Sequence, residues 1–524
     1  MFVSDSFYFT NFLLLASLSH GVAYCNNNPN VLLIMCDDLI DYDDVYKNFP
    51  EVITPNLDKF RNKSVDFVNA HTNVPISAPS RASMFTGVYP HKSGNYWFTP
   101  WYENTVLSSS KTMMTYFREN GYKVYGTGKL MHDLVKDDYT EFGLVNYPGP
   151  LPFDGKRPAP HPSIPPAFAA CGKLDGVFSS LADVPNVKAN GKVPGYNGWY
   201  DNQSRKPFRY VNDNDRDLMR DEEHAIWVIN KIKELENKKD DTPFFIGMGL
   251  SKPHTPLVAP QEYFDMYPLD KIKLPKMQKD NENLGYLKEN VPYCIGYRHY
   301  KALKEAYPDD WEYGLRKYLQ AYLACVTFAD DIIGSVLDAL EKSSFADNTV
   351  VIFVSDHGYD MGIKQRLFKN SLWNTSTEIP FYVYCPGDNY KHGVKVDAPV
   401  SLIDIYPTLI DLCHCKGSTI KDDNGSTLDG FSILPFLLDA DATEEWKGMD
   451  VALTLVRNPK DNEFTSQNYC VTSKEWKYIL YSNGREELYD LANDPYEWYN
   501  LAEKVKYHNI KERMNLKLKN ILHK

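Results

Sequence analysis

The stretch Val31-Leu32-Leu33-Ile34-Met35-Cys36-Asp37-Asp38 runs six apolar residues directly into two carboxylates. A short unbroken apolar run of this kind is typical of a strand that is buried on both faces, as in a parallel sheet. In an open α/β sheet, ligands bind beyond the carboxyl ends of the strands. We therefore expect this strand to lie inside a sheet and its two carboxylates to lie at a binding edge.

Comparable apolar runs recur along the chain and alternate with helical patterns. Further strands are expected at residues 123–126, 243–250, 349–355 and 381–384. Helical patterns cover residues 55–63, 111–120, 222–235 and 315–342. This alternation predicts an α/β domain with a large, mostly parallel sheet flanked by helices.

The character of the sequence changes near residue 439. Residues 450–455, 468–472 and 476–481 are expected to be strands of an antiparallel sheet, and 504–522 a basic helix. We expect a catalytic domain over 24–438 and a smaller C-terminal α+β subdomain over 439–524. A stretch rich in Pro, Gly and Ala at about 148–194 is either an insertion that walls the substrate site or a solvent loop without a role.

The N-terminus and several local motifs favour export. Residues 12–23 are apolar, end in small residues and are too short to span a bilayer, so residues 1–23 are expected to be a cleaved signal peptide. Four Asn-x-Ser/Thr triplets are candidate glycosylation sites: Asn62, Asn202, Asn374 and Asn424. We expect a lysosomal or secreted protein if the source is eukaryotic, and a periplasmic or secreted one if it is bacterial, with no transmembrane segment.

The net charge and the cysteines argue against a nucleic-acid-binding protein, a zinc protein and a disulfide-rich fold. The net charge of −12 gives no support to nucleic-acid binding. The nine cysteines leave an odd number and form no zinc-like spacing, so at most one or two disulfides are expected.

Reactive side chains follow four of the expected strands. Asp37 and Asp38 follow the first; the pairs after the next three are Lys129 and His132, Lys252 and His254, and Asp356 and His357. One such strand end is explained as well by a carboxylate that caps the next helix. Four together predict a shared active site.

The chemistry of these residues divides into two groups. Asp37, Asp38 and Asp356, with His357 beside them, are an oxygen-rich set that would repel without a cation and favours Ca²⁺ or Mg²⁺ over zinc. The pair Asp37-Asp38 alone is also compatible with an ordinary loop. The second group is basic and suits a tetrahedral oxyanion ester: Arg81, Lys129 and Lys252 supply charge, and His132 and His254 supply protons or hydrogen bonds.

The segment Ser77-Ala78-Pro79-Ser80-Arg81 is expected to begin a helix, because Pro is tolerated in a first turn. Ser77 would then lie at the helix N-terminus, where backbone N–H groups favour an anion, and Arg81 would lie one turn further on. The alternative is a plain N-cap Ser with a surface Arg.

Together these residues resemble the sulfatase family of the alkaline phosphatase superfamily, and most closely its iduronate-2-sulfatase branch. The family signature Cys/Ser-x-Pro-x-Arg matches Ser77 to Arg81, followed by Thr86-Gly87. Further matches are "PNVLLIMCDDL" (29–39), "TPNLD" (54–58), "GKLMH" (128–132), "KPHTP" (252–256), "SDHG" (355–358) and the C-terminal "ELYDL" (487–491). The resemblance covers about residues 29–502.

The resemblance implies a fold, a cofactor and a set of roles. It implies one Ca²⁺ bound by Asp37, Asp38, Asp356, His357 and the side chain at 77. It implies that the sulfate and the nucleophile are held by Arg81, Lys129, His132, Lys252, His254 and Lys369, with His254 as the acid for the leaving oxygen. It also implies that a maturation enzyme oxidises residue 77 to formylglycine, and that the substrate is a sulfated glycan, such as a 2-sulfated uronate.

Two departures from the family pattern leave alternatives open. Position 77 is Ser, whereas the aerobic eukaryotic maturation route needs Cys; and Ile363-Lys364-Gln365 replaces a Gly-Glu-His-Gly-like stretch, which puts the substrate rim there in doubt. Three hypotheses follow. Ser77 is oxidised and the protein is an active sulfatase; or the unmodified hydroxyl serves a phosphoesterase; or the protein binds sulfated glycans without turnover.

Overall fold

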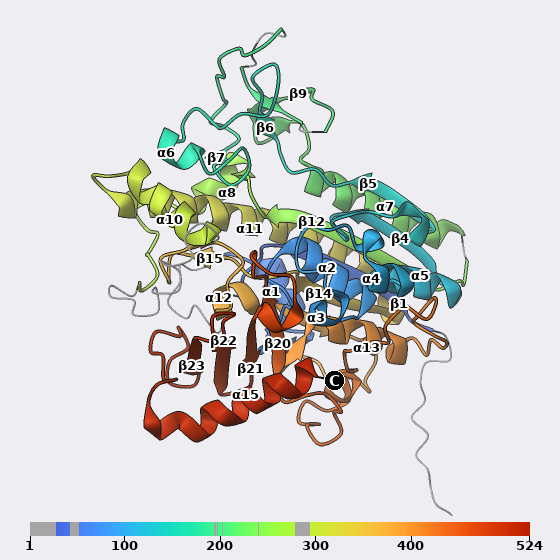
Figure 1. Ribbon diagram of the computed structural model, residues 1–524. Helices are drawn as coiled ribbons and strands as arrows, with labels where there is room; N and C mark the ends of the chain where they lie inside the picture. The colour runs from blue at the N-terminus through green and yellow to red at the C-terminus, as the bar shows by residue number, and fades with distance from the viewer. Residues whose placement is uncertain are drawn as a thin grey trace, which may run out of the picture.

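The computed structural model describes residues 28–41, 52–192, 195, 197–201, 203–238, 240–277 and 294–523 (Figure 1). A central eight-stranded sheet organises most of this chain. Its strands, in the order in which they lie side by side, are β18 (Val394–Val396), β2 (Val65–Phe67), β17 (Phe381–Tyr384), β14 (Thr349–Ser355), β1 (Asn30–Asp37), β12 (Phe244–Pro253), β4 (Lys123–Gly128) and β5 (Glu141–Val145). Only β17 runs antiparallel to its neighbours within this sheet, so the predicted mostly parallel sheet is confirmed.

Strand β1 is buried along its whole length because it has a hydrophobic core on each side. Leu32, Ile34 and Cys36 belong to one apolar cluster. The alternate residues Val31, Leu33 and Met35 belong to the other. Successive side chains of a strand point to opposite faces, so a continuous apolar run is what a strand between two helical layers requires.

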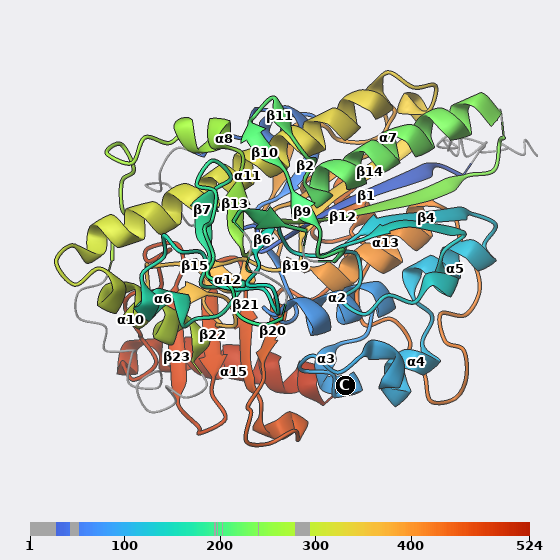
Figure 2. The ribbon, with the colours of Figure 1, turned by 90° about the horizontal axis from the view of Figure 1, so that it is seen from above.

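Helices cover both faces of the sheet (Figure 2). One layer holds α1 (Pro55–Arg61), α7 (Arg220–Lys238) and α11 (Trp311–Glu341), whose buried side chains join the first cluster. The other layer holds α2 (Ser77–Thr86), α5 (Met113–Glu119) and α13 (Ile405–Leu412), which join the second. The helices predicted at 55–63, 111–120, 222–235 and 315–342 correspond to α1, α5, α7 and α11.

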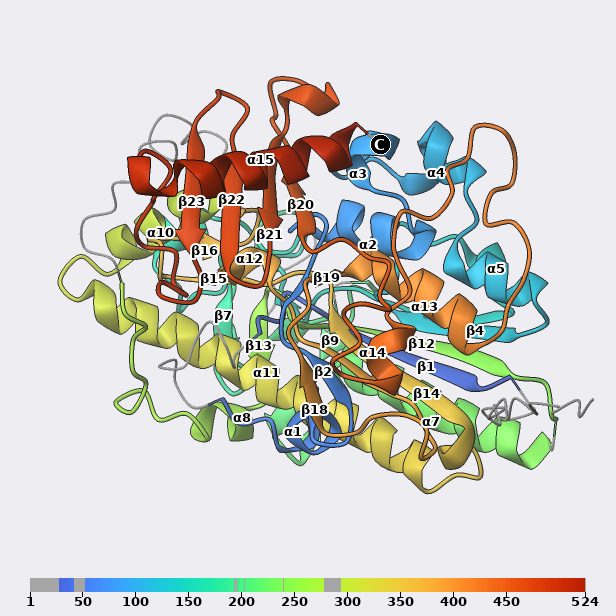
Figure 3. The same cartoon turned by 90° about the horizontal axis from the view of Figure 1, so that it is seen from below.

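The C-terminal part forms a separate four-stranded antiparallel sheet, as predicted (Figure 3). Its strands are β20 (Ala452–Val456), β21 (Asn468–Thr472), β22 (Trp476–Leu480) and β23 (Glu486–Asp490). Helix α15 (His508–Leu522) lies across it and buries Met514, Leu518 and Ile521. Backbone bonds tie β20 to the catalytic part: Leu455 N–H donates to the Asn73 carbonyl at 2.8 Å.

Shorter elements complete the chain. They are β3 (Ala70–His71), α3 (Pro90–Ser93), α4 (Thr105–Ser109), β6 (Leu151–Pro152), α6 (Pro166–Ala169), β7 (Phe178–Ser180), β8 (Trp199–Tyr200), β9 (Pro207–Phe208), β10 (Tyr210–Asn212), β11 (Asp215–Arg216), β13 (Leu257–Ala259), α8 (Gln261–Asp265), α10 (Ile295–Ala306), β15 (Asp360–Met361), β16 (Leu367–Phe368), α12 (Asn374–Thr377), β19 (Val400–Ser401) and α14 (Leu434–Leu438). The Pro-rich stretch expected to be irregular carries β6, α6 and β7, at the top of Figure 1.

One local expectation is corrected by burial. Asn374 is only 6% exposed and its amide oxygen accepts a hydrogen bond from Lys477, so it cannot carry a glycan in the folded protein. Asn62 and Asn424 are exposed, whereas Asn202 lies outside the described residues. In the described part of the chain the eight cysteines are all free, and seven of them are buried.

The expected signal peptide, residues 1–23, lies outside the described residues, as does Cys25. Among the helices that the structure describes, none combines the length and the apolar character that crossing a bilayer requires.

Candidate active site

Four buried side chains that could hold a metal ion meet at the carboxyl ends of β1 and β14. Asp37 ends β1, Asp38 follows it, and Asp356 and His357 follow β14. The two strands are parallel neighbours with Cys36 opposite Ser355, so the residues that come next are placed side by side. One ligand atom from each of Asp37, Asp38, Asp356 and His357 lies within 4.8 Å of the others. The interpretation of Asp37-Asp38 as an ordinary loop pair is therefore wrong.

Ser77 faces this cluster from the first position of α2, as the sequence predicts. Its hydroxyl donates to Asp37 Oδ1 at 2.9 Å and lies 3.1 Å from His357 Nε2. The other ring nitrogen of His357, Nδ1, is 3.0 Å from the Gly358 carbonyl, which can only accept. That contact puts the proton on Nδ1 and leaves Nε2 as a free lone pair beside Ser77.

Arg81 is fully buried behind Ser77, which excludes the alternative of a surface Arg. Its Nε donates to Asp356 Oδ2 at 3.0 Å, and its Nη1 donates to the carbonyls of Lys129 and Leu130. Its Nη2 lies 3.7 Å from Asp37 Oδ1 and has no hydrogen-bond partner in the described part of the chain. A planar guanidinium with one open donor is well suited to hold an oxyanion.

Two lysines complete the charged ring. Lys129 Nζ contacts the Asp37 carboxylate, and Lys369 Nζ lies 2.6 Å from Asp38 Oδ1. Lys369 belongs to the loop after β16, which Arg366 fixes: Arg366 pairs with Asp360 at 2.9 Å and donates to the Lys369 carbonyl at 3.3 Å. Arg366 lies in no recognised motif, so the sequence did not predict its role.

Of the two expected histidines, His254 lies close to the cluster. Its Nε2 is 3.9 Å from Asp38 Oδ2, and its Nδ1 donates to the Thr255 carbonyl at 2.6 Å, so Nε2 faces the cluster. His132 is half-exposed beside Asp133. Burial and the charge of Lys129 lower the pKa of His132.

Lys252 is not brought into the cluster. It is buried, but its Nζ donates to the Pro256 carbonyl of its own loop. Burial lowers its pKa, and the opposing influences come from Cys325 and Asp221 rather than from the metal-ligating carboxylates. Its backbone N–H is held by Asp221 of α7, a further residue that sequence reasoning missed.

The segment Ile363-Lys364-Gln365, where the sequence departs from the family pattern, is largely buried. Ile363 and Lys364 are both buried. Lys364 Nζ donates to the Glu497 carbonyl and lies 4.8 Å from the ring centroid of Trp373. This segment therefore packs against the C-terminal sheet.

The electrostatics of the cluster fit a divalent cation. Burial raises the pKa of Asp38 well above its usual range, and the neighbouring carboxylates add to this. Burial also acts to raise the pKa of Asp37, but Lys129, His254 and Arg81 overcome it and hold that pKa well below its usual range. Asp38 Oδ2 is buried with no hydrogen-bond partner in the described part of the chain. Three carboxylates, a bare imidazole nitrogen and a hydroxyl that converge in this way suit Ca²⁺ or Mg²⁺.

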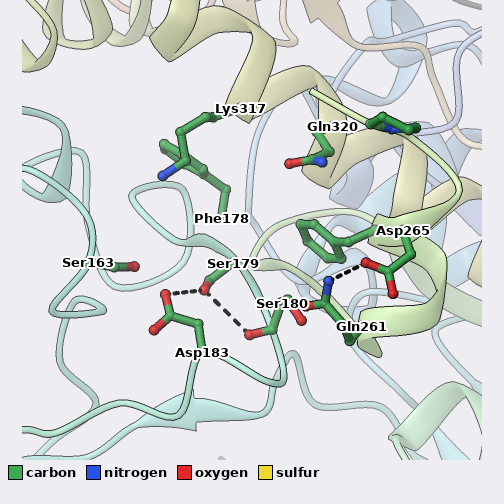
Figure 4. Close-up of a pocket in the computed structure, with 11 residues that line it drawn as sticks. Ser163, Phe178, Ser179, Ser180, Asp183, Gln261, Asp265, Lys317 and Gln320 are labelled. Carbon is green, nitrogen blue, oxygen red and sulfur yellow. Dashed lines mark hydrogen bonds between the residues drawn. The ribbon is translucent and has the colours of Figure 1, made fainter. Parts of the chain in front are cut away.

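A separate cavity of about 410 Å³ opens between β7, α8 and α11 (Figure 4). Its lining includes Asp183, Gln261, Lys317 and Gln320, and none of the cluster residues. This cavity is therefore separate from the reactive cluster, which lies at the carboxyl ends of β1 and β14.

Comparison with known proteins gives a consistent picture. A family profile described as "Sulfatase" matches residues 29–415, and one described as "N-sulphoglucosamine sulphohydrolase, C-terminal" matches residues 364–524. A protein named "Sulfatase" from Formosa agariphila is 32% identical over 502 residues, covering 92% of this chain and 84% of that protein. Iduronate 2-sulfatase from Mus musculus is 29% identical over 384 residues, covering 68% of this chain and 59% of that protein.

Solved structures agree on the fold. A structure described as a 2-O GAG sulfatase superimposes with a TM-score of 0.64 at 20% identity, covering 95% of this chain and 92% of that one.

Proposed function

The chain belongs to the sulfatase family, whose members hydrolyse sulfate esters, and we propose that its substrate is a sulfated polysaccharide and that Ser77 acts in oxidised form. The observation that carries the proposal is the position of Ser77 Oγ. It lies between Asp37 and His357, at the start of a helix and in front of the buried Arg81. A side chain so placed would help to hold the metal and would face an incoming ester.

Maturation of Ser77 is a two-electron oxidation of its Cβ–Oγ group to an aldehyde, with loss of two hydrogens. A maturation enzyme that carries a two-electron acceptor has to remove them. Once the aldehyde is hydrated, one hydroxyl oxygen would bond to the sulfur while the S–O bond to the substrate alcohol breaks and the alcohol leaves. The second hydroxyl would then lose its proton and become the aldehyde oxygen, while the C–O bond to the sulfate breaks.

The remaining residues bind the ester and move its protons. Asp37, Asp38, Asp356 and His357 would hold one Ca²⁺, which when bound supplies positive charge next to the sulfate oxygens. Arg81, Lys129 and Lys369 place further positive charge around the same point, where it stabilises the charge that develops on the oxygens. His254 Nε2 faces the cluster. Because Nδ1 holds the proton of the neutral ring and burial lowers the pKa of His254, Nε2 would first take up a proton from the attacking hydroxyl and then give it to the leaving alcohol oxygen.

We assign two of the expected residues lesser roles. His132 lies at the edge of the charged ring and would contact the substrate rather than the metal. Lys252 would support the loop that carries His254, because its ammonium and its backbone N–H are both bonded within that region.

A glycan substrate is supported by what the relatives act on. One similar structure is described as a 2-O GAG sulfatase, and another as a complex with a glucosamine that carries 2-N and 6-O sulfates. Iduronate 2-sulfatase is among the similar sequences. We propose an acidic, sulfated sugar chain that the protein meets after export.

The test is sulfate release from an aryl sulfate and from a sulfated heparin disaccharide. The native protein should release sulfate, and Ser77→Ala should not. Ser77→Cys, co-expressed with a Cys-type maturation enzyme, should regain activity if the remaining pocket is competent. No release by any of these proteins would refute the proposal.

A phosphoesterase that uses the unmodified hydroxyl is the second candidate. It is favoured by the Ser itself, whose unmodified hydroxyl already lies in the cluster, bonded to Asp37 and 3.1 Å from His357 Nε2. Turnover of an aryl phosphate but not of an aryl sulfate would select it. Tight binding of the heparin disaccharide without turnover of either ester would instead select a glycan-binding protein.

A further inference from the structure

We propose that Trp97, Phe98 and Arg457 form a subsite for an acidic sugar ring next to the sulfate pocket. The inference rests on the proposed function and adds to it the surface that recognises the glycan. Three flat side chains and one imidazole lie in a row that leads from the C-terminal sheet to the charged ring.

The row is defined by ring contacts. The Phe98 ring centroid is 5.1 Å from that of His132 and 5.1 Å from that of Trp97, to which it stands edge-on at 83°. On the far side, the guanidinium carbon of Arg457 lies 5.9 Å from the Trp97 ring centroid. Residues 97, 98, 132 and 457 come from three distant parts of the sequence.

One end of the row reaches the reactive cluster. His132 follows Lys129 by three residues, and Lys129 contacts the Asp37 carboxylate. The charges of Lys129, Asp37 and Arg81 all act on His132. Because His132 lies three residues after Lys129 and contacts Phe98, a sulfate held at Arg81 and Lys129 would bring the sugar that carries it towards His132 and Phe98.

Phe98 is 43% exposed even though its loop is well anchored. Asn95 donates to the Thr99 carbonyl at 3.3 Å, Trp101 donates through its indole to the Asp133 carbonyl at 2.9 Å, and Tyr96 is buried. An aromatic ring held in water by a fixed loop loses the stabilisation that burial would give it. The exposure of the Phe98 ring near the reactive site is explained if a bound ligand covers the ring.

The chemistry of the row suits an acidic pyranose. The apolar face of a sugar ring packs on an aromatic side chain, and a guanidinium stacked on an indole remains free to bind a carboxylate or sulfate. Arg457 donates to the Asn462 amide oxygen at 3.3 Å, and in the described part of the chain no carboxylate lies within ion-pair distance of it. In a protein with a net charge of −12, an unpaired cation in this place selects an anionic unit.

The test measures binding apart from turnover. In the Ser77→Ala background, calorimetry would follow a sulfated heparin tetrasaccharide, with the desulfated tetrasaccharide for comparison. Phe98→Ala and Arg457→Gln should each weaken binding of the sulfated form by about tenfold. Phe98→Tyr keeps a flat ring and should retain most of the affinity. Arg457→Gln should also flatten the dependence of affinity on salt.

Tyr102→Ala is the matched control, because Tyr102 is an aromatic of a neighbouring segment with a similar exposure of 47%. It should leave the affinity within about twofold. Circular dichroism and thermal unfolding would check that each variant is folded.

Equal affinities for Phe98→Ala, Arg457→Gln and Tyr102→Ala would overturn the subsite, and so would failure of the Ser77→Ala protein to bind the sulfated tetrasaccharide. Phe98-dependent binding by a protein that releases no sulfate would keep the subsite and refute the proposed hydrolysis. If the protein releases sulfate from the tetrasaccharide and neither Phe98→Ala nor Arg457→Gln changes that release, the subsite is refuted and the proposed hydrolysis is kept.

Discussion

Replacing Lys477 by Met should uncouple the C-terminal sheet from the catalytic part of the chain. Lys477 is fully buried, and its Nζ lies 3.1 Å from Glu497 Oε1, 2.6 Å from the Asn374 amide oxygen and 3.1 Å from the Thr377 hydroxyl. The Met side chain removes the positive charge and leaves the 2%-exposed Glu497 without it. Removing one partner of a buried ion pair costs about 3–5 kcal/mol of unfolding free energy.

Two structural details place this variant towards the lower end of that range. Lys364 is also buried near Glu497, and its charge acts to stabilise the carboxylate. Glu497 Oε2 keeps its hydrogen bond from the Asn374 backbone N–H at 2.9 Å. We therefore expect a loss of about 3 kcal/mol, measured by urea unfolding at pH 7.

The control is Lys474→Met on the same sheet. Lys474 pairs with Asp397 at 2.6 Å, but both side chains are more than half exposed, so the loss should stay below about 1 kcal/mol. The double variant Lys477→Met/Glu497→Gln should recover part of the stability, because no unpaired charge remains. A cost for Lys477→Met no larger than that for Lys474→Met would refute the reasoning.

Three further predictions concern pH, metal and the buried guanidinium. Burial lowers the pKa of His224 to about 3, so the unfolded chain binds a proton below about pH 6.5 that the folded chain does not, and stability falls as the pH falls. Between pH 6.5 and 5 this residue should account for about 1.6 kcal/mol of lost stability, so the loss measured by urea unfolding should be smaller for His224→Gln. EGTA should lower the midpoint of thermal unfolding and Ca²⁺ should restore it, whereas Asp356→Asn should lose this response; a midpoint unaffected by either reagent would contradict the metal assignment. Arg81→Lys should reduce sulfate release by roughly 100-fold, because an ammonium cannot reach both Asp356 and the carbonyls of Lys129 and Leu130; near-normal release would contradict that role.

The meeting of Asp37, Asp38, Asp356 and His357 could be predicted from the sequence because the signals for it are local. An apolar run long enough to cross a sheet, followed at once by carboxylates, fixes both the strand and the edge at which its last residues lie. This holds for Asp37 and Asp38 after β1, and for Asp356 and His357 after β14. Ser77 and Arg81 are also placed locally, by a helix that begins at Ser77.

Lys252 and His254 show where this local reasoning ends. The expected strand stops at residue 250, but β12 continues to Pro253. Where a strand ends decides which face its last side chains take. The apolar pattern ends three residues before β12 does, so it cannot predict which of the following side chains face the cluster. In the structure His254 reaches the cluster and Lys252 does not.

Asn374 fails as a glycosylation site for a different reason. A three-residue motif contains no information about burial, whereas the partners that bury Asn374 are Lys477 and Glu497, more than 100 positions away. Arg366 is similar, because its importance lies in contacts with Asp360 and with the backbone that positions Lys369. Such tertiary contacts leave no periodic signal in the sequence.

The most direct test of the account is the mass of the peptide that contains Ser77, taken from the native protein. The account predicts a peptide lighter by two hydrogens than the sequence requires, with the difference located at Ser77, and an aldehyde there that reacts with a hydrazine. A peptide of the unmodified mass, from a protein that still releases sulfate, would contradict it.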